Sequence, residues 1–178
     1  MENESQKVKQ FQTERLFLKP TSEEDALFIF QLYNSPKWLK NIGNRNVHSE
    51  DDGRRYIPAK MLPQLQRLGF SNFTVIRKAD GLKIGGCGLI DREGLEGIDL
   101  GFAFLPEYEK QGYALEAALE IKRAACEDFN LKRILAITSE ENFSSQKLLE
   151  KLRFKYKELV KIPGEEMQLF LYECHLEQ

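Results

Sequence analysis

Apolar and polar positions along the chain alternate in two ways that predict two kinds of element. Short apolar segments bounded by turn residues predict strands over 15–19, 70–77, 83–90, 98–104, 133–138, 155–160 and 167–175. Apolar residues at three- and four-residue spacing predict helices near 26–33, 49–67, 113–129 and 142–152. Pro58 and Pro63 are candidate breaks that would divide the helix over 49–67 into shorter pieces. The first four strands follow one another as an antiparallel meander. The strand over 133–138 comes after a long helix, so we expect it to run parallel to 98–104. The pattern predicts an α/β (α+β) fold.

Turn-forming and polar residues between these segments set their limits. Residues 1–12 are polar and are predicted to be a flexible leader, and 13–178 are predicted to form a single domain, because no linker or internal repeat interrupts them. Residues 37–48 carry a glycine and three asparagines and are predicted to be an irregular connection. Asn130 is placed to end the long helix in a left-handed conformation.

Composition excludes several classes of function. The formal net charge is −2, which offers no basic field for nucleic acid. No run of about 18 apolar residues is present, so we expect no membrane span. The first ten residues lack an apolar signal core, so we expect a cytoplasmic protein. Three cysteines and two histidines have no metal-ligand spacing, and we expect neither a metal site nor a disulfide framework.

The stretch from Leu100 to Phe129 carries the strongest chemical signal. An apolar strand leads into a loop with Gly112, and the loop leads into the first turn of the long helix. Unpaired backbone N–H groups and the helix dipole make such a junction an anion site, suited to phosphate. The P-loop and Rossmann glycine patterns are both absent. The remaining interpretation is a phosphorylated ligand that backbone amides hold, with Gly112 allowing its close approach.

Several segments together resemble the GCN5-related N-acetyltransferases (GNAT), and within them the branch that includes the ribosomal-protein alanine acetyltransferases, RimJ and RimL. The matching segments are ERLFLKPTSEEDA (14–26), IGGCGLI (84–90), DLGFAFLPEYEKQGYALEA (99–117) and NFSSQKLLEKLRF (142–154). The family signature [Q/R]xxGx[G/A] falls on 109–114, where Gly112 and Ala114 match and Glu109 departs. Lys110 could offset the charge of Glu109. The resemblance implies a six- to seven-stranded sheet, splayed between its fourth and fifth strands and flanked by about four helices.

The resemblance also implies acetyl-CoA as the donor, with no metal. Its pyrophosphate would lie on the amides of 110–114 and its pantetheine arm along 100–104. Asn142 matches the position that holds this arm, and as a helix N-cap it has a structural alternative. The implied cofactor-binding residues are Leu100, Phe102, Phe104, Lys110, Gln111, Gly112, Tyr113, Ala114, Asn142 and Ser145.

Catalytic and acceptor-binding residues are implied with alternatives. Ser145 is the candidate acid for the leaving thiolate, or a plain helix-start residue; the tyrosine common in the superfamily is replaced by Leu149. Asp99 is the candidate base that takes the proton of the amine. The alternative is that Asp99 is an exposed strand-edge carboxylate and that a chain of water molecules takes the proton. Trp38 and Tyr56 are candidate substrate contacts, or core aromatics.

Cys87 lies in a strand near the expected acetyl site. It has two interpretations: a covalent acetyl carrier, or a small buried core residue of the kind that free cysteine commonly is.

These observations predict an acetyl-CoA-dependent N-acetyltransferase that acts on a primary amine, either a protein N-terminus or a small molecule, by direct attack in a ternary complex. The alternative is a non-catalytic module that uses the same fold to bind acyl-CoA or a protein. We expect no nucleic-acid or membrane partner, and a monomer or a homodimer.

Overall fold

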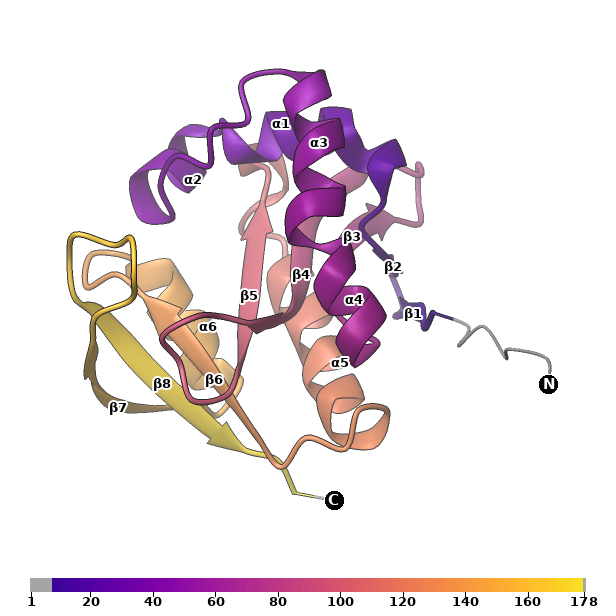
Figure 1. Cartoon of the computed structure of the whole chain (residues 1–178). Helices are drawn as coiled ribbons and strands as arrows, with labels where there is room; N and C mark the ends of the chain where they lie inside the picture. Colours follow the sequence, from indigo (N-terminus) through magenta and orange to yellow (C-terminus); the bar gives the residue numbers. More distant parts are fainter. Residues whose placement is uncertain (1–7, 178) are drawn as a thin grey trace, which may run out of the picture.

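The computed structural model describes residues 8–177, and its centre is a single eight-stranded sheet (Figure 1). The strand order is β1-β2-β3-β4-β5-β6-β8-β7, and every neighbouring pair is antiparallel except β5 and β6. The strands are β1 (Phe11–Gln12), β2 (Leu16–Pro20), β3 (Asn72–Arg77), β4 (Lys83–Asp91), β5 (Ile98–Phe104), β6 (Arg133–Thr138), β7 (Lys155–Val160) and β8 (Leu169–His175).

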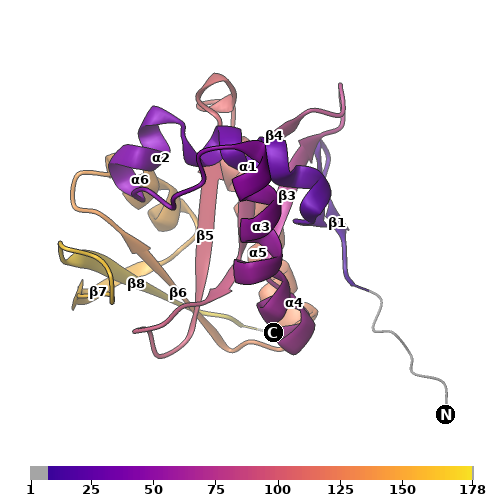
Figure 2. The same cartoon turned by 45° about the horizontal axis from the view of Figure 1, so that its top comes forward.

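Helices cover both faces of this sheet. Figures 1 and 2 show α3 and α4 in front of β3–β5 and α5 behind them, with α6 beside β6. The α-helices are α1 (Ala26–Tyr33), α2 (Pro36–Asn41), α3 (Glu50–Lys60), α4 (Leu62–Leu68), α5 (Tyr113–Glu127) and α6 (Phe143–Lys151). Two 3₁₀ turns, η1 (Glu23–Asp25) and η2 (Pro106–Tyr108), precede α1 and the loop before α5.

Two hydrophobic cores follow from the alternation of side chains along the strands. In β5, Leu100 and Phe104 belong to the larger core, which also takes the buried face of α5. Ala103 packs instead against the smaller core, which α1 and α3 form on the opposite side. Gly85 of β4 leaves room for the Phe104 ring, because a Cβ atom there would lie 2.4 Å from it. Alternate residues of β5 therefore face two different compartments.

The sheet is split between β5 and β6. These strands are parallel and share a single paired position, Asp99 with Leu135, whereas β6 pairs with β8 over six positions. Beyond Asp99 the two strands diverge, so the rest of β5 has no strand neighbour on that side. This is the expected split. It was predicted after the fourth strand and falls after the fifth, because β1 adds one strand at the edge of the sheet.

Most predicted elements are confirmed, several with their limits. Strands over 98–104, 133–138 and 155–160 begin and end where the pattern places them, and β5 and β6 are parallel as expected. At the start of η1, the Ser22 amide donates to the Asp25 carboxylate at 3.0 Å, as in a capping box. Asn130 has a φ of 56°, which is the predicted left-handed stop.

Three expectations about the elements were wrong. The sheet has eight strands, because the two-residue β1 pairs with β2, and there are six α-helices rather than about four. Residues 37–48 are not wholly irregular: Pro36 occupies the first turn of α2, a position that proline favours. The helix predicted over 49–67, with Pro58 and Pro63 as candidate breaks, is indeed divided, at Met61, into α3 and α4: Pro63 lies in the first turn of α4, whereas Pro58 lies inside α3 without breaking it.

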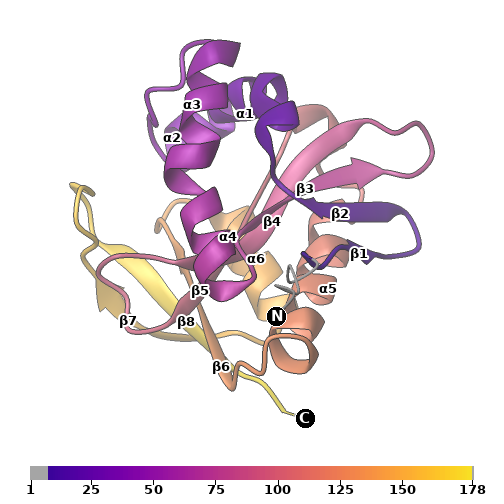
Figure 3. The same cartoon turned by 45° about the vertical axis from the view of Figure 1, so that its right-hand side comes forward.

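The predicted leader lies partly outside the described residues. Of the remainder, Phe11 and Gln12 form β1, and Phe11 is buried against Phe73 with ring centroids 5.4 Å apart. Figure 3 brings this edge of the sheet forward and shows β1 and β2 beside α5. The fold therefore includes at least these two residues of the leader.

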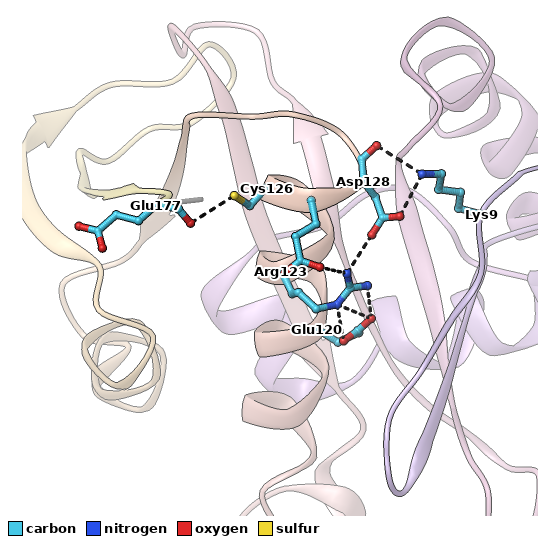
Figure 4. A network of polar contacts seen from close by, with 7 residues as sticks. Lys9, Glu120, Arg123, Cys126, Asp128 and Glu177 are labelled. Carbon is cyan, nitrogen blue, oxygen red and sulfur yellow. Dashed lines mark hydrogen bonds and ion pairs between the residues drawn. The ribbon is translucent and has the colours of Figure 1, made fainter.

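Polar contacts fix the C-terminal end of α5 (Figure 4). Lys9 forms an ion pair of 2.9 Å with Asp128, and Arg123 pairs with both Glu120 and Asp128. The thiol of Cys126 donates to the carbonyl oxygen of Glu177 at 3.4 Å. These contacts join α5 to both ends of the described chain, which holds the helix in place and with it the loop at its N-terminus.

Candidate active site

The loop before α5 has the backbone geometry of an anion site. Lys110 and Gly112 both have left-handed φ angles, of 58° and 82°, and α5 begins at Tyr113. Loops that alternate in hand direct successive N–H groups to one side, and the first turn of a 15-residue helix adds further free N–H groups and the positive end of its dipole. Glycine at 112 is needed for this conformation, since a side chain there costs about 1–2 kcal/mol.

Arg15, from the segment before β2, supports this loop and was missed by sequence reasoning. Its guanidinium donates to the Gln111 carbonyl at 3.0 Å and to Glu116 at 2.7 Å, and it lies 4.3 Å from the centre of the Tyr113 ring. No local signal could have revealed it, because Arg15 and Gln111 are 96 residues apart in the chain.

A cavity of about 390 Å³ opens beside this loop, between α5, α6 and α2. Its wall includes Phe102 and Phe104 of β5, and Asn142 and Ser145 at the start of α6. Four lysines and one acidic residue also line it: Lys37, Lys110, Lys147, Lys151 and Glu109. This excess of positive charge suits an anionic ligand. We call it the loop cavity.

Glu109, the residue that departs from the family signature, is paired within this wall. Its carboxylate lies 3.0 Å from the Lys37 ammonium of α2. Its counter-charge is therefore Lys37 and not, as expected, Lys110.

A second cavity, of about 250 Å³, lies toward α1, α3 and α4. Trp38, Tyr56 and Asp99 line it. It shares wall residues with the loop cavity, so the two cavities adjoin: Trp38, Asn41, Ile42, Phe102, Ala103, Asn142 and Ser145. We call this second one the inner cavity.

Asp99 is a buried carboxylate on the wall of the inner cavity. It is 1% exposed, so the alternative of an exposed strand-edge carboxylate is wrong. Arg92 donates to Oδ2 at 3.2 Å, while Oδ1 has no hydrogen-bond partner among residues 8–177. Burial raises the pKa of Asp99, and the charge of Arg92 opposes that rise. Asp99 is therefore a better proton acceptor near neutral pH than an exposed aspartate.

Residues at the start of α6 combine a structural position with access to both cavities. Asn142 is the N-cap, since its Oδ1 accepts from the Ser145 amide at 3.2 Å and from the Ser144 hydroxyl at 3.1 Å. Ser145 lines both cavities. The structural alternative for Asn142 is thus confirmed, and it leaves a ligand role for the same residue open to test.

Trp38 and Tyr56 belong to one aromatic group around Tyr33. Trp38 stacks on Tyr33 with ring centroids 3.9 Å apart, and Tyr56 meets Tyr33 edge-on at 5.4 Å. Both rings pack against the smaller core and both line the inner cavity. The position of these two residues therefore agrees with both interpretations, a contact to the substrate and a place in the core.

The family follows from comparison with known proteins. A family model described as an acetyltransferase (GNAT) domain matches residues 15–155. The chain belongs to the GNAT acetyltransferase family. The predicted family and the predicted enzyme class are thereby confirmed.

Among relatives of this acetyltransferase is the uncharacterized N-acetyltransferase p20 of Bacillus licheniformis, 30% identical over 152 residues that cover 84% of each chain. The uncharacterized N-acetyltransferase YnaD of Bacillus subtilis is 25% identical over 140 residues, 79% of each chain. The ribosomal L7/L12 alpha-N-protein acetyltransferase RimL, solved with coenzyme A, has a TM-score of 0.80 at 14% identity, over 94% of this chain and 98% of its own. At that identity the likeness concerns the fold.

The acetyltransferase brings most of the predicted cofactor residues to one place. Of those ten, eight line the loop cavity: Phe102, Phe104, Lys110, Gly112, Tyr113, Ala114, Asn142 and Ser145. Leu100 instead lines the inner cavity and is buried in the larger core. Gln111 lines neither cavity, and its side chain donates to the Glu107 carbonyl. Eight of the ten therefore lie together, and the binding roles of all ten stay predictions.

The cysteines of the acetyltransferase are all buried, and no disulfide joins them. Burial raises the pKa of the Cys87 thiol far above its ordinary value, which keeps it protonated. This favours the core interpretation of Cys87 over an acetyl carrier. Within residues 8–177 no cluster of three metal-ligating side chains occurs, and no helix there is both long and apolar enough to cross a bilayer.

Proposed function

We propose that this acetyltransferase transfers the acetyl group of acetyl-CoA directly to a primary amine, with acetyl-CoA in the loop cavity and the amine in the inner cavity. The observation that carries the proposal is the unpartnered Oδ1 of buried Asp99 in a cavity that adjoins the loop cavity at Ser145. The backbone of 110–114 and the surrounding lysines suit the phosphates of the donor.

In the proposed reaction the amine nitrogen attacks the thioester carbonyl. A C–N bond forms and the C–S bond breaks, so the amine loses a proton and the thiolate gains one. Asp99, whose pKa is raised by burial, accepts the amine proton through Oδ1. Ser145 donates a proton to the departing thiolate and is reprotonated from solvent water, to which Asp99 releases the proton it took from the amine. RimL, named as an alpha-N-protein acetyltransferase, supports a protein N-terminus as one acceptor to test.

The test measures free CoA released from acetyl-CoA in the presence of a panel of amines that includes N-terminal peptides, amino acids, polyamines and amino sugars. We expect turnover with at least one class. The variants D99N and S145A should each lower kcat about 100-fold, the lower end of the range of general acid–base effects.

The neighbouring serine provides a matched control. Ser144 is also in the first turn of α6, but it lines the loop cavity alone, away from the amine, and its hydroxyl donates to Asn142. S144A should therefore keep kcat close to that of the wild type. If acetyl-CoA raises the melting temperature but no amine gives turnover, the protein is a binding module and the proposal is wrong. Equal kcat values for S145A and S144A would remove Ser145 from the reaction.

A further inference from the structure

The inner cavity gathers buried polar atoms that have no hydrogen-bond partner within the described protein. Four such side-chain atoms occur among residues 8–177, and three of them belong to residues that line this cavity: Trp38 Nε1, Asp99 Oδ1 and Thr138 Oγ1. Buried polar groups in native proteins are almost always paired, so three unpaired ones around one cavity call for a bound ligand. The ligand must offer a donor to Asp99 and an acceptor to the indole N–H.

The charges around the inner cavity define that ligand further. Its wall carries the cations Arg45, Lys60 and Arg92, and the anions Asp99 and Glu165. Arg92 and Asp99 are paired with each other at 3.2 Å. Once this pair is set aside, two cations, Arg45 and Lys60, face one carboxylate, Glu165.

These two cations are weakly engaged by the protein itself. Arg45 approaches Glu165 at 3.9 Å, close to the limit of an ion pair, and Lys60 has no ion pair in the described part of the chain. A second cation on the ligand would be repelled by Arg45 and Lys60, whereas an anion would find unused partners.

We propose that the acceptor is a primary amine that also carries a carboxylate. Its nitrogen is placed by Asp99 Oδ1, and its carboxylate is bound by Arg45 and Lys60. This inference rests on the proposed function. The same chemistry is present in a free amino acid and in a peptide with an acidic residue near its N-terminus. Polyamines and amino sugars lack it.

The experiment compares matched acceptors that differ in one charge. The pairs are alanine with alaninamide, and an Ala-Asp N-terminal peptide with its Ala-Asn and Ala-Lys counterparts; spermidine is the polycationic arm. The measured quantity is kcat/KM from CoA release, corrected for the fraction of neutral amine at the assay pH. We expect the carboxylate-bearing member of a pair to exceed its neutral counterpart about tenfold, as for charge-assisted hydrogen bonds. Preference in the alanine pair identifies a free amino acid, and preference in the peptides alone identifies a protein N-terminus.

Charge reversal at Arg45 provides the site test. R45E should abolish or invert the preference for the carboxylate. R54Q is the matched control, because Arg54 pairs with Glu50 and Asp51 on the exposed face of α3 and lies outside the cavity wall. R54Q should keep the wild-type ratio.

Two results would overturn the inference alone: a neutral or polycationic amine as the best acceptor of the wild type, or an unchanged ratio in R45E. Absence of CoA release with every amine would instead contradict the proposed function.

Discussion

Arg153 shows how one residue can be at odds with its backbone in an otherwise well-formed helix end. The amides of Phe154 and Arg153 donate to the carbonyls of Leu149 and Glu150 at 2.9 Å each, which is a Schellman motif with Arg153 at its left-handed position. Its φ of 65° is one that glycine adopts without cost and that other residues adopt at about 1–2 kcal/mol. The strain is local and belongs to stability, because Arg153 lines neither cavity.

The variant R153G should therefore stabilise the protein. Relief of left-handed strain exceeds the extra freedom that glycine gives to the unfolded chain, and the net gain is about 0.5–1 kcal/mol. For a chain of this size, thermal unfolding should shift upward by about 1–4 °C. E150G, inside the same helix, is the control and should lose about 1 kcal/mol. A lower melting temperature for R153G would show that the Arg153 side chain stabilises the fold in a way its contacts do not reveal.

At the scale of elements, the loop over 109–114 is held by parts of the chain that lie far from it in sequence. Arg15 reaches it from the start of β2, with Thr13 adding a hydrogen bond of 2.5 Å to Glu116. Lys37 reaches it from α2 through Glu109. The helix N-terminus provides the N–H groups, and these contacts keep the loop in the conformation that presents them.

Loss of Arg15 should consequently weaken donor binding more than it slows the chemical step. In R15A we expect KM for acetyl-CoA to rise about 3- to 10-fold, the loss of one charge-assisted hydrogen bond, with kcat within about twofold. R15K keeps the charge but lacks the planar fork that bridges Gln111 and Glu116, so its KM should be intermediate. R54A serves as a surface control. Equal losses of kcat in R15A and R54A, with KM unchanged, would contradict this role.

At the scale of the whole molecule, the split divides the sheet into two bodies, which the larger hydrophobic core joins. One contains β1 to β5 with α5, and the other contains β6 to β8 with α6. Direct links between them include the Lys122 ammonium to the Leu152 carbonyl at 2.7 Å and the Arg133 guanidinium to the Glu96 carbonyl at 2.6 Å. The loop cavity has walls from both bodies.

Acetyl-CoA bound in the loop cavity should therefore protect both bodies at once. Hydrogen exchange followed by mass spectrometry should slow in β5, in 109–114 and in the first turn of α6 at saturating acetyl-CoA, because a ligand bound to the folded state suppresses opening of the segments that line its cavity. The β2–β3 pair, which lines neither cavity along most of its length, is the internal control. Protection confined to one body would place the ligand elsewhere.

Local signals in the sequence were enough for most of the elements and for the loop over 109–114. Apolar periodicity placed β5, β6 and β7 without error, and the strand–loop–helix junction with Gly112 predicted an anion site whose backbone has that geometry. These features depend on residues that are neighbours in the chain, so they leave a trace in the sequence. α2 was not predicted, because it has only six residues, followed by glycine and asparagine, and so short a segment shows too little apolar periodicity.

Tertiary structure alone decided what surrounds that loop. It buried Asp99, which had an exposed strand edge as its alternative, and left one of its oxygens unpartnered in a cavity. It brought Arg15 and Lys37 to the loop, and Arg45 and Lys60 to the inner cavity. The physical reason is range: helix starts and strand periods are set by bonds between near neighbours, whereas burial, charge pairing and cavity walls are set by packing between segments far apart in the chain. The sequence by itself therefore determined the fold and the anion-site geometry of one loop, and only packing determined which side chains line the two cavities.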